Sequence, residues 1–326
     1  MQAMISIMNN ALAIKIPLGI SSCLLGQEVR YDGGHRHNAY ITQSLGDFFM
    51  FIPFCPELAI GMTVPRPPIQ LREINNEIRV VGVKDNSIDK TEALLEYGKE
   101  TAVKNKQLCG YIFKKDSPSC GMERVKVYGK TGMPERKGRG LYTTGFIAQQ
   151  PALPVEEEGR LMDPHLRENF IERVFIYSRW QDYQTDGMTP AKLVDFHTRH
   201  KFIIQAHDEV VYRELGRLVS NIGNADIQEM AGKYLLQLMT ALKQIATTKT
   251  HTNVLMHIMG FLKSRLDSHD KKELLDILEE YRLGRVPLIV PITLIKHYLR
   301  IYPDDYINQQ FYLNPHPSEL MLRNHI

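Results

Sequence analysis

Three of the four cysteines in this chain of 326 residues follow apolar runs that are typical of β-strands. Cys23 ends the run IKIPLGISSC, Cys55 ends FMFIPFC, and Cys120 lies in SPSCG, shortly after the run LCGYIF. In an open α/β sheet, ligands bind at the carboxyl ends of the strands. Three thiols brought to one edge of a sheet therefore indicate a site for a metal ion or an iron–sulfur cluster.

The spacing of these cysteines excludes the commonest zinc modules, because the sequence contains no C-x-x-C pair. Three separate thiolates leave one position open on zinc or iron. An open iron acts as a Lewis acid toward a soft donor such as sulfur. The alternative is that the cysteines are buried core residues, which is common for this residue type. We assign that structural role to Cys109, which lies inside the run LCGYIF.

Four motifs resemble, in order and spacing, those of the TudS-type thiouracil desulfidases over residues 16–157. They are SSCLLGQEVRYDGG, FCPE, PRPP and KKDSPSCG. The resemblance implies a 4Fe–4S cluster that removes sulfur from a thiolated pyrimidine without redox change. It implies cluster ligands at Cys23, Cys55 and Cys120, a catalytic glutamate at Glu57 and a catalytic serine at Ser117. From the residues alone, Glu57 could merely start a helix and Ser117 a turn.

The second half of the chain resembles a domain of unassigned function that is often fused to such desulfidases. The resemblance covers residues 190–326 and rests on DFHTRHKFIIQAH, HTNVLMHIMGFLK and PHPSELMLRNH. Fused chains of this layout resemble RudS-type enzymes, which remove sulfur from 4-thiouridine in tRNA. The resemblance thus implies tRNA as a partner and a helical domain that helps to hold it.

Basic residues are candidates for contacts with the substrate. We predict such contacts for Arg66, Arg136, Lys137, Arg139, Arg199 and Lys201, and next for Lys263 and Arg265. A net charge of +3 is too small to prove a polyanionic partner, so a merely solvated basic helix surface is the alternative. Arg66, in VPRPP, could instead only pin its loop. We interpret His197 and His200 as polar helix residues rather than metal ligands.

The elements that must position these residues change in kind along the chain. Over residues 1–157, β-like runs alternate with helical stretches, which predicts an α/β domain with a mixed sheet and Rossmann-like layers. Asn75 and Asn76 predict a hairpin turn, and residues 39–49 and 90–106 have helical character. We expect the basic segment 129–140 to be a mobile loop and Asp32 with Gly33 to form a turn.

The rest of the chain is predicted to be helical. Residues 158–189 form a linker and a first helix that Asp163 could cap. Residues 190–326 form an all-helical domain, with helices predicted at 190–211, 226–247, 253–266, 271–282 and 292–302.

The composition narrows the class of protein. No apolar stretch approaches the length of a membrane span, the start of the chain does not resemble a signal peptide, and four cysteines do not make a disulfide framework. We therefore expect a cytoplasmic protein with reduced thiols and no membrane partner.

Three other functions are compatible with these features. We find no G-x-x-x-x-G-K-[ST] loop and so expect no nucleotide cofactor, which disfavours an enzyme that inserts sulfur into tRNA. A desulfidase of free thiolated pyrimidines and an RNA-binding protein with a structural metal are the other two.

Overall fold

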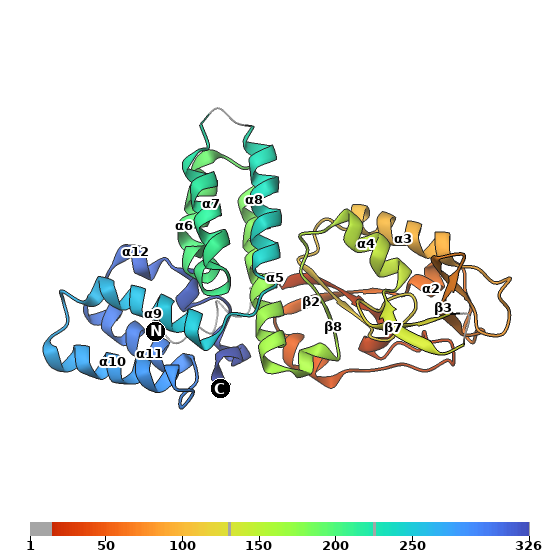
Figure 1. Ribbon diagram of the computed structural model, residues 1–326, viewed down its shortest axis with the longest axis horizontal. Helices are drawn as coiled ribbons and strands as arrows, with labels where there is room; N and C mark the ends of the chain where they lie inside the picture. Colours follow the sequence, from red (N-terminus) through yellow and green to blue (C-terminus); the bar gives the residue numbers. More distant parts are fainter. Residues whose placement is uncertain (1–14, 130–131, 224–225, 326) are drawn as a thin grey trace, which may run out of the picture. The chain divides into compact units, whose positions relative to one another are not determined.

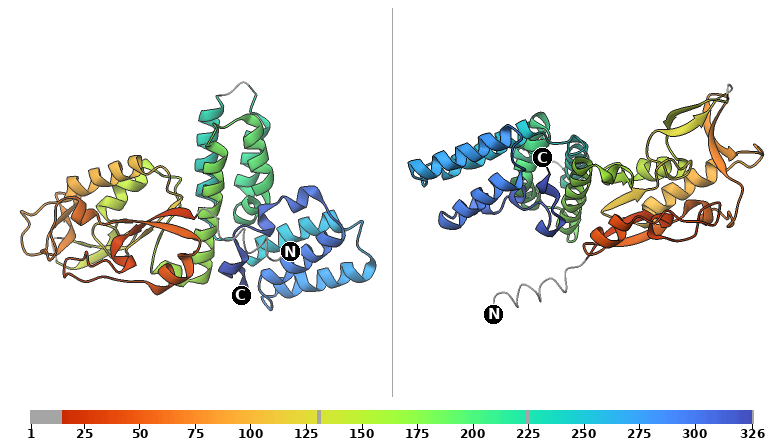
Figure 2. Two further views of the ribbon diagram at one scale, coloured as in Figure 1. Left: turned by 180° about the vertical axis from the view of Figure 1, so that it is seen from behind. Right: turned by 90° about the horizontal axis from the view of Figure 1, so that it is seen from below.

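The computed structural model of the protein describes residues 15–129, 132–223 and 226–325 (Figure 1). The chain divides into two compact units after Leu161, and each unit is considered by itself. Within the described residues, all strands lie in the first unit, and the second unit is helical (Figure 2). The predicted combination of an α/β domain and an all-α domain is confirmed.

One sheet of the N-terminal unit consists of parallel strands in the order β2-β1-β5-β8. The strands are β1 (Ile16–Ser21), β2 (Phe49–Phe54), β5 (Gly110–Phe113) and β8 (Val155–Glu157). The two central strands, β1 and β5, are the most buried, as the continuous apolar runs predict. Because the strands are parallel, the loops that follow their carboxyl ends share one edge of the sheet.

The second sheet is mixed and has the order β4-β3-β6-β7. Its strands are β3 (Ile69–Ile74), β4 (Glu77–Gly82), β6 (Val125–Tyr128) and β7 (Pro134–Gly138). The predicted hairpin is confirmed: β3 and β4 are antiparallel, and Asn75 and Asn76 have positive φ angles of 52° and 65°. Such angles at both central residues are those of a type I′ turn.

Strand β7 occupies part of the basic segment for which we predicted a mobile loop. It pairs antiparallel with β6, and Lys137 lies 3.1 Å from carboxylate oxygens of both Glu73 and Glu135. The prediction is therefore wrong for residues 134–138, because strand pairing and ion pairs to a distant strand cannot be read from local composition. Residues 130 and 131 of the segment lie outside the described residues.

Two helices of the N-terminal unit, α3 (Thr91–Lys104) and α4 (Leu141–Gln149), pack side by side (Figures 1 and 2). Glycines allow this close approach. A Cβ on Gly98 would lie 2.2 Å from the carbonyl oxygen of Tyr142, and a Cβ on Gly145 would lie 2.1 Å from that of Leu95. The rings that form the adjoining core are Tyr111, Phe113, Tyr142 and Phe146.

The remaining helical segments of this unit are short. They are η1 (Ser22–Leu25), η2 (Tyr40–Leu45), α2 (Pro56–Ala59) and η3 (Arg160–Met162). The helix predicted over residues 39–49 is thus only the short π-helix η2. It ends at Gly46, where a Cβ would lie 2.4 Å from the carbonyl oxygen of Thr42.

The C-terminal unit contains eight α-helices within its described residues, followed by short 3-10 turns. The helices are α5 (Pro164–Gln184), α6 (Pro190–His207), α7 (Glu209–Ser220), α8 (Ile227–Ala241), α9 (Thr248–Leu262), α10 (Ser268–Arg282), α11 (Ile289–Ile301) and α12 (Asp305–Asn308). The turns are η4 (Phe311–Leu313), η5 (Ser318–Leu320) and η6 (Leu322–Asn324). The predicted cap is confirmed, because Asp163 accepts hydrogen bonds from the amides of His165 and Leu166.

Asp208 divides the helix that we predicted at residues 190–211. Its backbone is extended, so it ends α6, and its Oδ1 accepts hydrogen bonds from the amides of Val210 and Val211 at 2.9 and 3.0 Å, so it also caps α7. An Asp inside a helical pattern offers this alternative to the backbone. The prediction of one continuous helix is therefore wrong.

Trp180 marks the core of the helical unit. It is the one tryptophan of the chain, is 1% exposed, and stacks on Tyr234 with ring centroids 5.6 Å apart. Phe196 packs edge-on against it. No helix among the described residues is long and apolar enough to cross a membrane.

Candidate functional site

Three cysteines line one cavity at the carboxyl edge of the parallel sheet. Cys55 directly follows β2, Cys23 lies in η1 just after β1, and Cys120 lies in the loop after β5. The strand order places β1 between β2 and β5, so the three loops are neighbours. The cavity has a volume of about 460 Å³, within the range of small-molecule sites.

The loop that carries Cys120 is organised by a serine hydroxyl. Ser117 Oγ accepts hydrogen bonds from the amides of Ser119 and Cys120 at 3.2 and 3.0 Å. Gly121 is required at the next position, because a Cβ there would lie 2.3 Å from the side chain of Val125. Both lone pairs of the Ser117 hydroxyl are thereby used, and its hydrogen is left for a donor role toward the cavity.

Two consecutive glutamates at the end of β8 hold this loop at both of its ends. Glu157 Oε1 accepts a hydrogen bond of 2.7 Å from the amide of Met122. Glu158 accepts one of 2.8 Å from the amide of Lys115 and pairs with the ammonium of Lys114. Burial raises the pKa of Glu157, against the effect of its amide donors. The sequence shows these residues only as an acidic stretch, so their role depends on the fold.

Glu57 lies in the first turn of α2 and points into the same cavity. Its Oε2 accepts from Arg66, with Nε at 2.8 Å and Nη2 at 2.6 Å. Its Oε1 accepts a hydrogen bond of 2.8 Å from the Ser119 hydroxyl. The carboxylate is therefore fixed through both oxygens, and Oε1 keeps a lone pair for one further partner. Ser119, which is fully buried, was not among the predicted site residues.

Arg66 lines the cavity, but protein acceptors occupy most of its guanidinium. Besides Glu57, it donates to the carbonyl oxygens of Thr63 at 3.1 Å and Val29 at 2.9 Å, and it is buried. These bonds favour the pinning role over the predicted substrate contact. Arg66 orients Glu57 and ties together two loops of the cavity wall.

Burial governs the acidity of the cavity thiols. It raises the pKa of Cys23, against the effects of Lys114 and Arg30, and it raises the pKa of Cys55. It raises the pKa of Cys120 well above its ordinary value. Such thiols become thiolates readily only beside a strong positive charge such as a metal. Cys109 is buried outside the cavity lining, with Sγ 3.7 Å from the carbonyl oxygen of Gln107.

Four cations that were not among the predicted site residues also line the cavity: Arg30, Arg36, Lys114 and Lys115. Lys114 is paired with Glu158, and Arg30 lies 3.8 Å from Asp32. Arg36 and Lys115 have no carboxylate partner among the described residues. Asp32 and Gly33 form the predicted turn, in which the amide of Gly34 donates to Asp32 Oδ1. Arg30 and Tyr31, which precede this turn, line the cavity, so the motif RYDGG could have predicted these two site residues.

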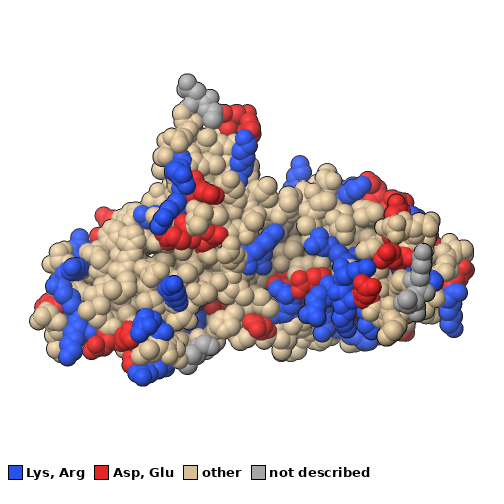
Figure 3. Space-filling model, viewed as in Figure 1, with Lys and Arg blue, Asp and Glu red and all other residues tan. Residues whose placement is uncertain are grey.

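The other predicted basic contacts do not line this cavity. Arg136 pairs with Asp116, Arg139 donates to the carbonyl oxygen of Met122, and Arg199 pairs with Asp195. The ammonium of Lys201 lies over the ring of Tyr306. Figure 3 shows Lys and Arg side chains gathered on one face of the N-terminal unit, with acidic side chains at the margin. The predicted basic residues outside the cavity each already have a partner within the chain: Arg136, Lys137, Arg139, Arg199 and Lys201.

His197 and His200 are core residues of the helical unit rather than exposed polar ones. His197 Nδ1 lies 3.0 Å from the Tyr234 hydroxyl, and His200 Nε2 accepts from Arg179 Nε at 3.1 Å. Burial lowers the pKa of both imidazoles. Among the residues that the structure describes, no group of three His, Cys, Asp or Glu side chains is arranged to hold a metal ion.

Taken together, the cavity combines soft donors, a fixed carboxylate and a hydroxyl donor. Such a set can hold a thiophilic metal centre and can move a proton at the oxygen of Glu57. The cations at its rim favour an anionic or phosphate-bearing ligand.

Comparison with known proteins divides the chain in the same way. Residues 18–158 match the family described as 2-thiouracil desulfurase, and residues 201–317 match a family described as a protein of unknown function, DUF1722. The uncharacterized protein YbgA of Escherichia coli K12 is 32% identical over 153 residues, which are 47% of this chain and 90% of that protein. The uncharacterized protein YbbK of Bacillus subtilis 168 is 30% identical over 152 residues, 44% of this chain and 97% of that protein.

One solved structure is also similar. It is described as the [4Fe-4S]-dependent thiouracil desulfidase TudS, is 30% identical, and is matched over 46% of this chain and 95% of its own, with a TM-score of 0.35.

Proposed function

Because this chain belongs to the 2-thiouracil desulfurase family through residues 18–158, we propose that it removes sulfur from 4-thiouridine in tRNA. The observation that carries the proposal is the convergence of three thiols, Glu57 and Ser117 on one cavity. The reaction replaces C=S by C=O: water supplies the oxygen and two protons, and sulfide leaves as H₂S. The carbon keeps its oxidation level, so no electron donor is consumed.

The donor set fits an iron–sulfur cluster better than a single metal ion. One zinc ion needs its thiolates within about 2.3 Å of a common point, and the described residues contain no such arrangement. A 4Fe–4S cluster binds each cysteine to a different iron and needs a cavity between them. We assign Cys23, Cys55 and Cys120 as its ligands. When bound, the cluster would supply an open iron, a Lewis acid with affinity for sulfur.

Glu57 serves as the general base in this proposal. Arg66 and Ser119 hold both carboxylate oxygens, so Oε1 can accept a proton from a water placed in the cavity. The same proton can then pass to the ring nitrogen or to the departing sulfur. Proton transfer of this kind contributes about 10²–10⁴-fold to rate. Ser117, whose oxygen is saturated by two amides, donates its hydrogen to the pyrimidine or the water.

RNA as the substrate is supported by the charge around the cavity. Arg36 and Lys115 lack carboxylate partners among the described residues and line the cavity wall. A uridine within folded tRNA must turn out of its stack to reach such a site, which requires a grip on the flanking phosphates. The helical unit, of unassigned function, is proposed to help hold the tRNA.

The test is loss of 4-thiouridine from bulk tRNA, measured by mass spectrometry after incubation with anaerobically reconstituted protein. The wild type should convert 4-thiouridine to uridine, and Cys55→Ser should not. Cys109→Ser is the matched control, because Cys109 is outside the cavity lining, and it should stay active. A protein that binds iron and sulfide but leaves 4-thiouridine intact would contradict the proposal.

A desulfidase of free thiolated pyrimidines is the second candidate, because a cavity of about 460 Å³ can accept a single base. Turnover of free 4-thiouracil in the same assay distinguishes the two substrates. A colourless protein with zinc in place of iron would instead support an RNA-binding protein with a structural metal.

A further inference from the structure

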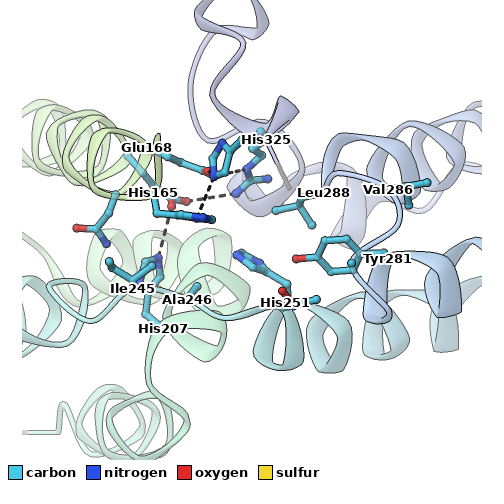
Figure 4. A pocket seen from close by; sticks show the side chains of 15 residues that line it. His165, Glu168, His207, Ile245, Ala246, His251, Tyr281, Val286, Leu288 and His325 are labelled. Atoms are coloured by element: carbon cyan, nitrogen blue, oxygen red, sulfur yellow. Dashed lines mark hydrogen bonds and ion pairs between the residues drawn. The ribbon is translucent and has the colours of Figure 1, made fainter. Parts of the chain in front are cut away.

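A second cavity lies within the helical unit (Figure 4), and none of the residues that line it has a role in the proposed chemistry. Its volume is about 80 Å³, which is room for roughly six water molecules at about 10–15 Å³ each. Helices α5, α9 and α10 and the C-terminal segment contribute to its wall. The polar side chains that matter here are Glu168, Glu172, His207, His251, Tyr281 and Arg323.

Two carboxylates on one face of α5 are incompletely satisfied. Arg323 lies between them, with Nε 3.2 Å from Glu168 Oε1 and Nη2 3.5 Å from Glu172 Oε1. His207 Nε2 is 3.4 Å from the other oxygen of Glu172, and His325 Nε2 is 3.4 Å from the other oxygen of Glu168. Charge-assisted hydrogen bonds usually measure about 2.7–2.9 Å. These long contacts leave both carboxylates able to accept a further donor from the cavity.

The nitrogen donors of the wall are already committed to the protein. His325 Nε2 lies 3.0 Å from His165 Nδ1 as well as near Glu168. The third donor nitrogen of Arg323, Nη1, bonds to the carbonyl oxygen of Tyr312 at 2.6 Å. His207 Nδ1 bonds to the carbonyl oxygen of Gln244 at 2.5 Å. An anion in this cavity would therefore face two carboxylates and find few donors, so its binding is disfavoured.

His251 provides an independent sign that the cavity receives a ligand. It is buried, its Nδ1 lies 3.0 Å from the Tyr312 hydroxyl, and its Nε2 has no partner among the described residues. The ring points into the cavity (Figure 4). Burial lowers the pKa of this imidazole to about 3, so it is neutral at pH 7. When Nδ1 donates to Tyr312, Nε2 offers a lone pair to a donor in the cavity.

We propose that this cavity binds a small organic cation, an alkylammonium group. Its N–H donors would meet Glu172 and His251, and its methylene groups would lie against the apolar wall formed by Ile245, Val286 and Leu288. Glu168, whose pKa burial raises to about 7, would join them in its ionised form. The ring of Tyr281 adds a surface that attracts cations. A metal ion is not favoured, because the described residues hold no group of three ligands for one. The competing possibility is a cavity filled by water alone.

Trp180 allows a direct test, because it lies on α5, the helix that carries both glutamates. We would follow thermal unfolding of the full-length protein by its fluorescence, in n-butylammonium, tetramethylammonium or butyrate at equal ionic strength. n-Butylammonium should raise the midpoint by several degrees and bind with a roughly millimolar dissociation constant. Tetramethylammonium has no N–H donor, and butyrate has the wrong charge. An equal effect of all three, or a larger effect of butyrate, would overturn the proposal.

Variants separate the site from general charge effects. Glu172→Gln should weaken n-butylammonium binding at least about tenfold by calorimetry. Glu229→Gln is the matched control, because Glu229 is a well-exposed carboxylate on α8 that pairs with Lys233 and does not line the cavity, and it should bind like the wild type. If circular dichroism shows that Glu172→Gln is unfolded, Glu168→Gln replaces it. Unchanged binding in a folded glutamine variant would rule out this site.

Discussion

At the scale of single residues, the orientation of the Glu57 carboxylate depends on residues that are distant in the sequence. The sequence places Glu57 after Cys55 and Pro56, a position equally typical of a helix start. In the structure Glu57 does lie in the first turn of α2, and in addition both of its oxygens are engaged, by Arg66 on one side and Ser119 on the other. Ser117 and Ser119 are two residues apart in SPSCG. Local sequence cannot tell which hydroxyl faces the carboxylate, because that depends on the path of the loop.

Ser119→Ala should lower turnover of the thiolated substrate by roughly tenfold or more. The hydroxyl donates a hydrogen bond of 2.8 Å to a charged oxygen, and such bonds contribute about 1.5–3 kcal/mol. Without it, Oε1 of Glu57 is no longer oriented. The measurement is kcat and KM, together with the absorbance of the cluster.

Ser87→Ala is the control, since this serine bonds only within an exposed turn, to Asp85. A normal kcat in Ser119→Ala, or loss of the cluster absorbance instead of turnover, would show that Ser119 does not orient the base.

At the scale of elements, the strands that end at the cysteines could be predicted, whereas the division of the predicted mixed sheet into one parallel and one mixed sheet, and the clamp on the Cys120 loop, could not. Apolar runs ending in Cys23 and Cys55 are local patterns, and the alternation of strands and helices indicates an α/β domain. Which strands pair with which depends on contacts between distant parts of the chain. Glu157 and Glu158 act on residues far away in the chain. Strand β7 was missed for the same reason, because it forms by pairing with β6. The break at Asp208 was missed because the side chain of Asp208 caps α7 and the backbone helix does not continue through it.

Glu158→Ala should loosen the loop that carries Cys120. The change leaves the amide of Lys115 without its acceptor and removes the carboxylate partner of Lys114, whose ammonium keeps only the carbonyl oxygen of Lys115. Loss of a hydrogen bond to a charged group costs about 1.5–3 kcal/mol. Hydrogen exchange of residues 114–123 should become faster by roughly tenfold or more, and less iron should be retained after gel filtration. Glu135→Ala, whose side chain is 71% exposed, should change neither. Unchanged exchange would mean that the glutamate does not hold the loop.

Helix α5 gives the helical unit a defined dependence on pH. Burial raises the pKa of Glu168 from 4.5 to about 7, despite the nearby Arg323. The native state therefore binds a proton more tightly than the unfolded state. This contribution to stability is complete below about pH 4.5 and is lost as the pH rises through 7, in total about 3 kcal/mol. Glu172 acts oppositely: its pKa of about 2, held low against burial by His207 and Arg323, gives stability that is lost as the pH falls from 4.5 toward 2.

The corresponding measurement is urea unfolding followed by Trp180 fluorescence at pH 5 and pH 8. The wild type should lose unfolding free energy between these values, and Glu168→Gln should lose about 3 kcal/mol less. Equal losses in both proteins would show that Glu168 does not titrate in this range.

At the scale of the whole molecule, each unit carries a different kind of chemistry. The N-terminal unit holds thiols, a fixed base and several cations around one cavity, whereas the helical unit holds buried imidazoles and carboxylates. The resemblance of the motifs predicted the thiols, Glu57 and Ser117 of the first unit, whereas the buried imidazoles and carboxylates of the helical unit were not predicted. The charged surface was predicted less well, because whether Arg136 or Arg199 pairs with a neighbouring carboxylate depends on the fold.

Binding of tRNA should weaken by roughly tenfold or more between about 50 and 200 mM salt, because phosphate contacts release counterions. Lys115→Gln should lower the magnitude of the salt slope by about one, since this cavity cation has no carboxylate partner among the described residues. Arg136→Gln should alter it less, because Arg136 is already paired with Asp116. Fluorescence anisotropy with labelled tRNA measures both. A flat salt response would contradict binding through phosphate.

The order of strands in the parallel sheet also means that this sheet is completed late in synthesis of the N-terminal unit. Strand β1 leaves the ribosome first, yet one of its two neighbours, β5, is made about ninety residues later, and β8, which closes the sheet, later still. Cys23 and Cys55 are therefore translated long before Cys120 and its two clamping glutamates exist. The nascent chain passes through a stage in which two thiols are present without the third. Under the proposed function, insertion of the cluster would therefore follow the emergence of Cys120 and of the glutamates that hold its loop.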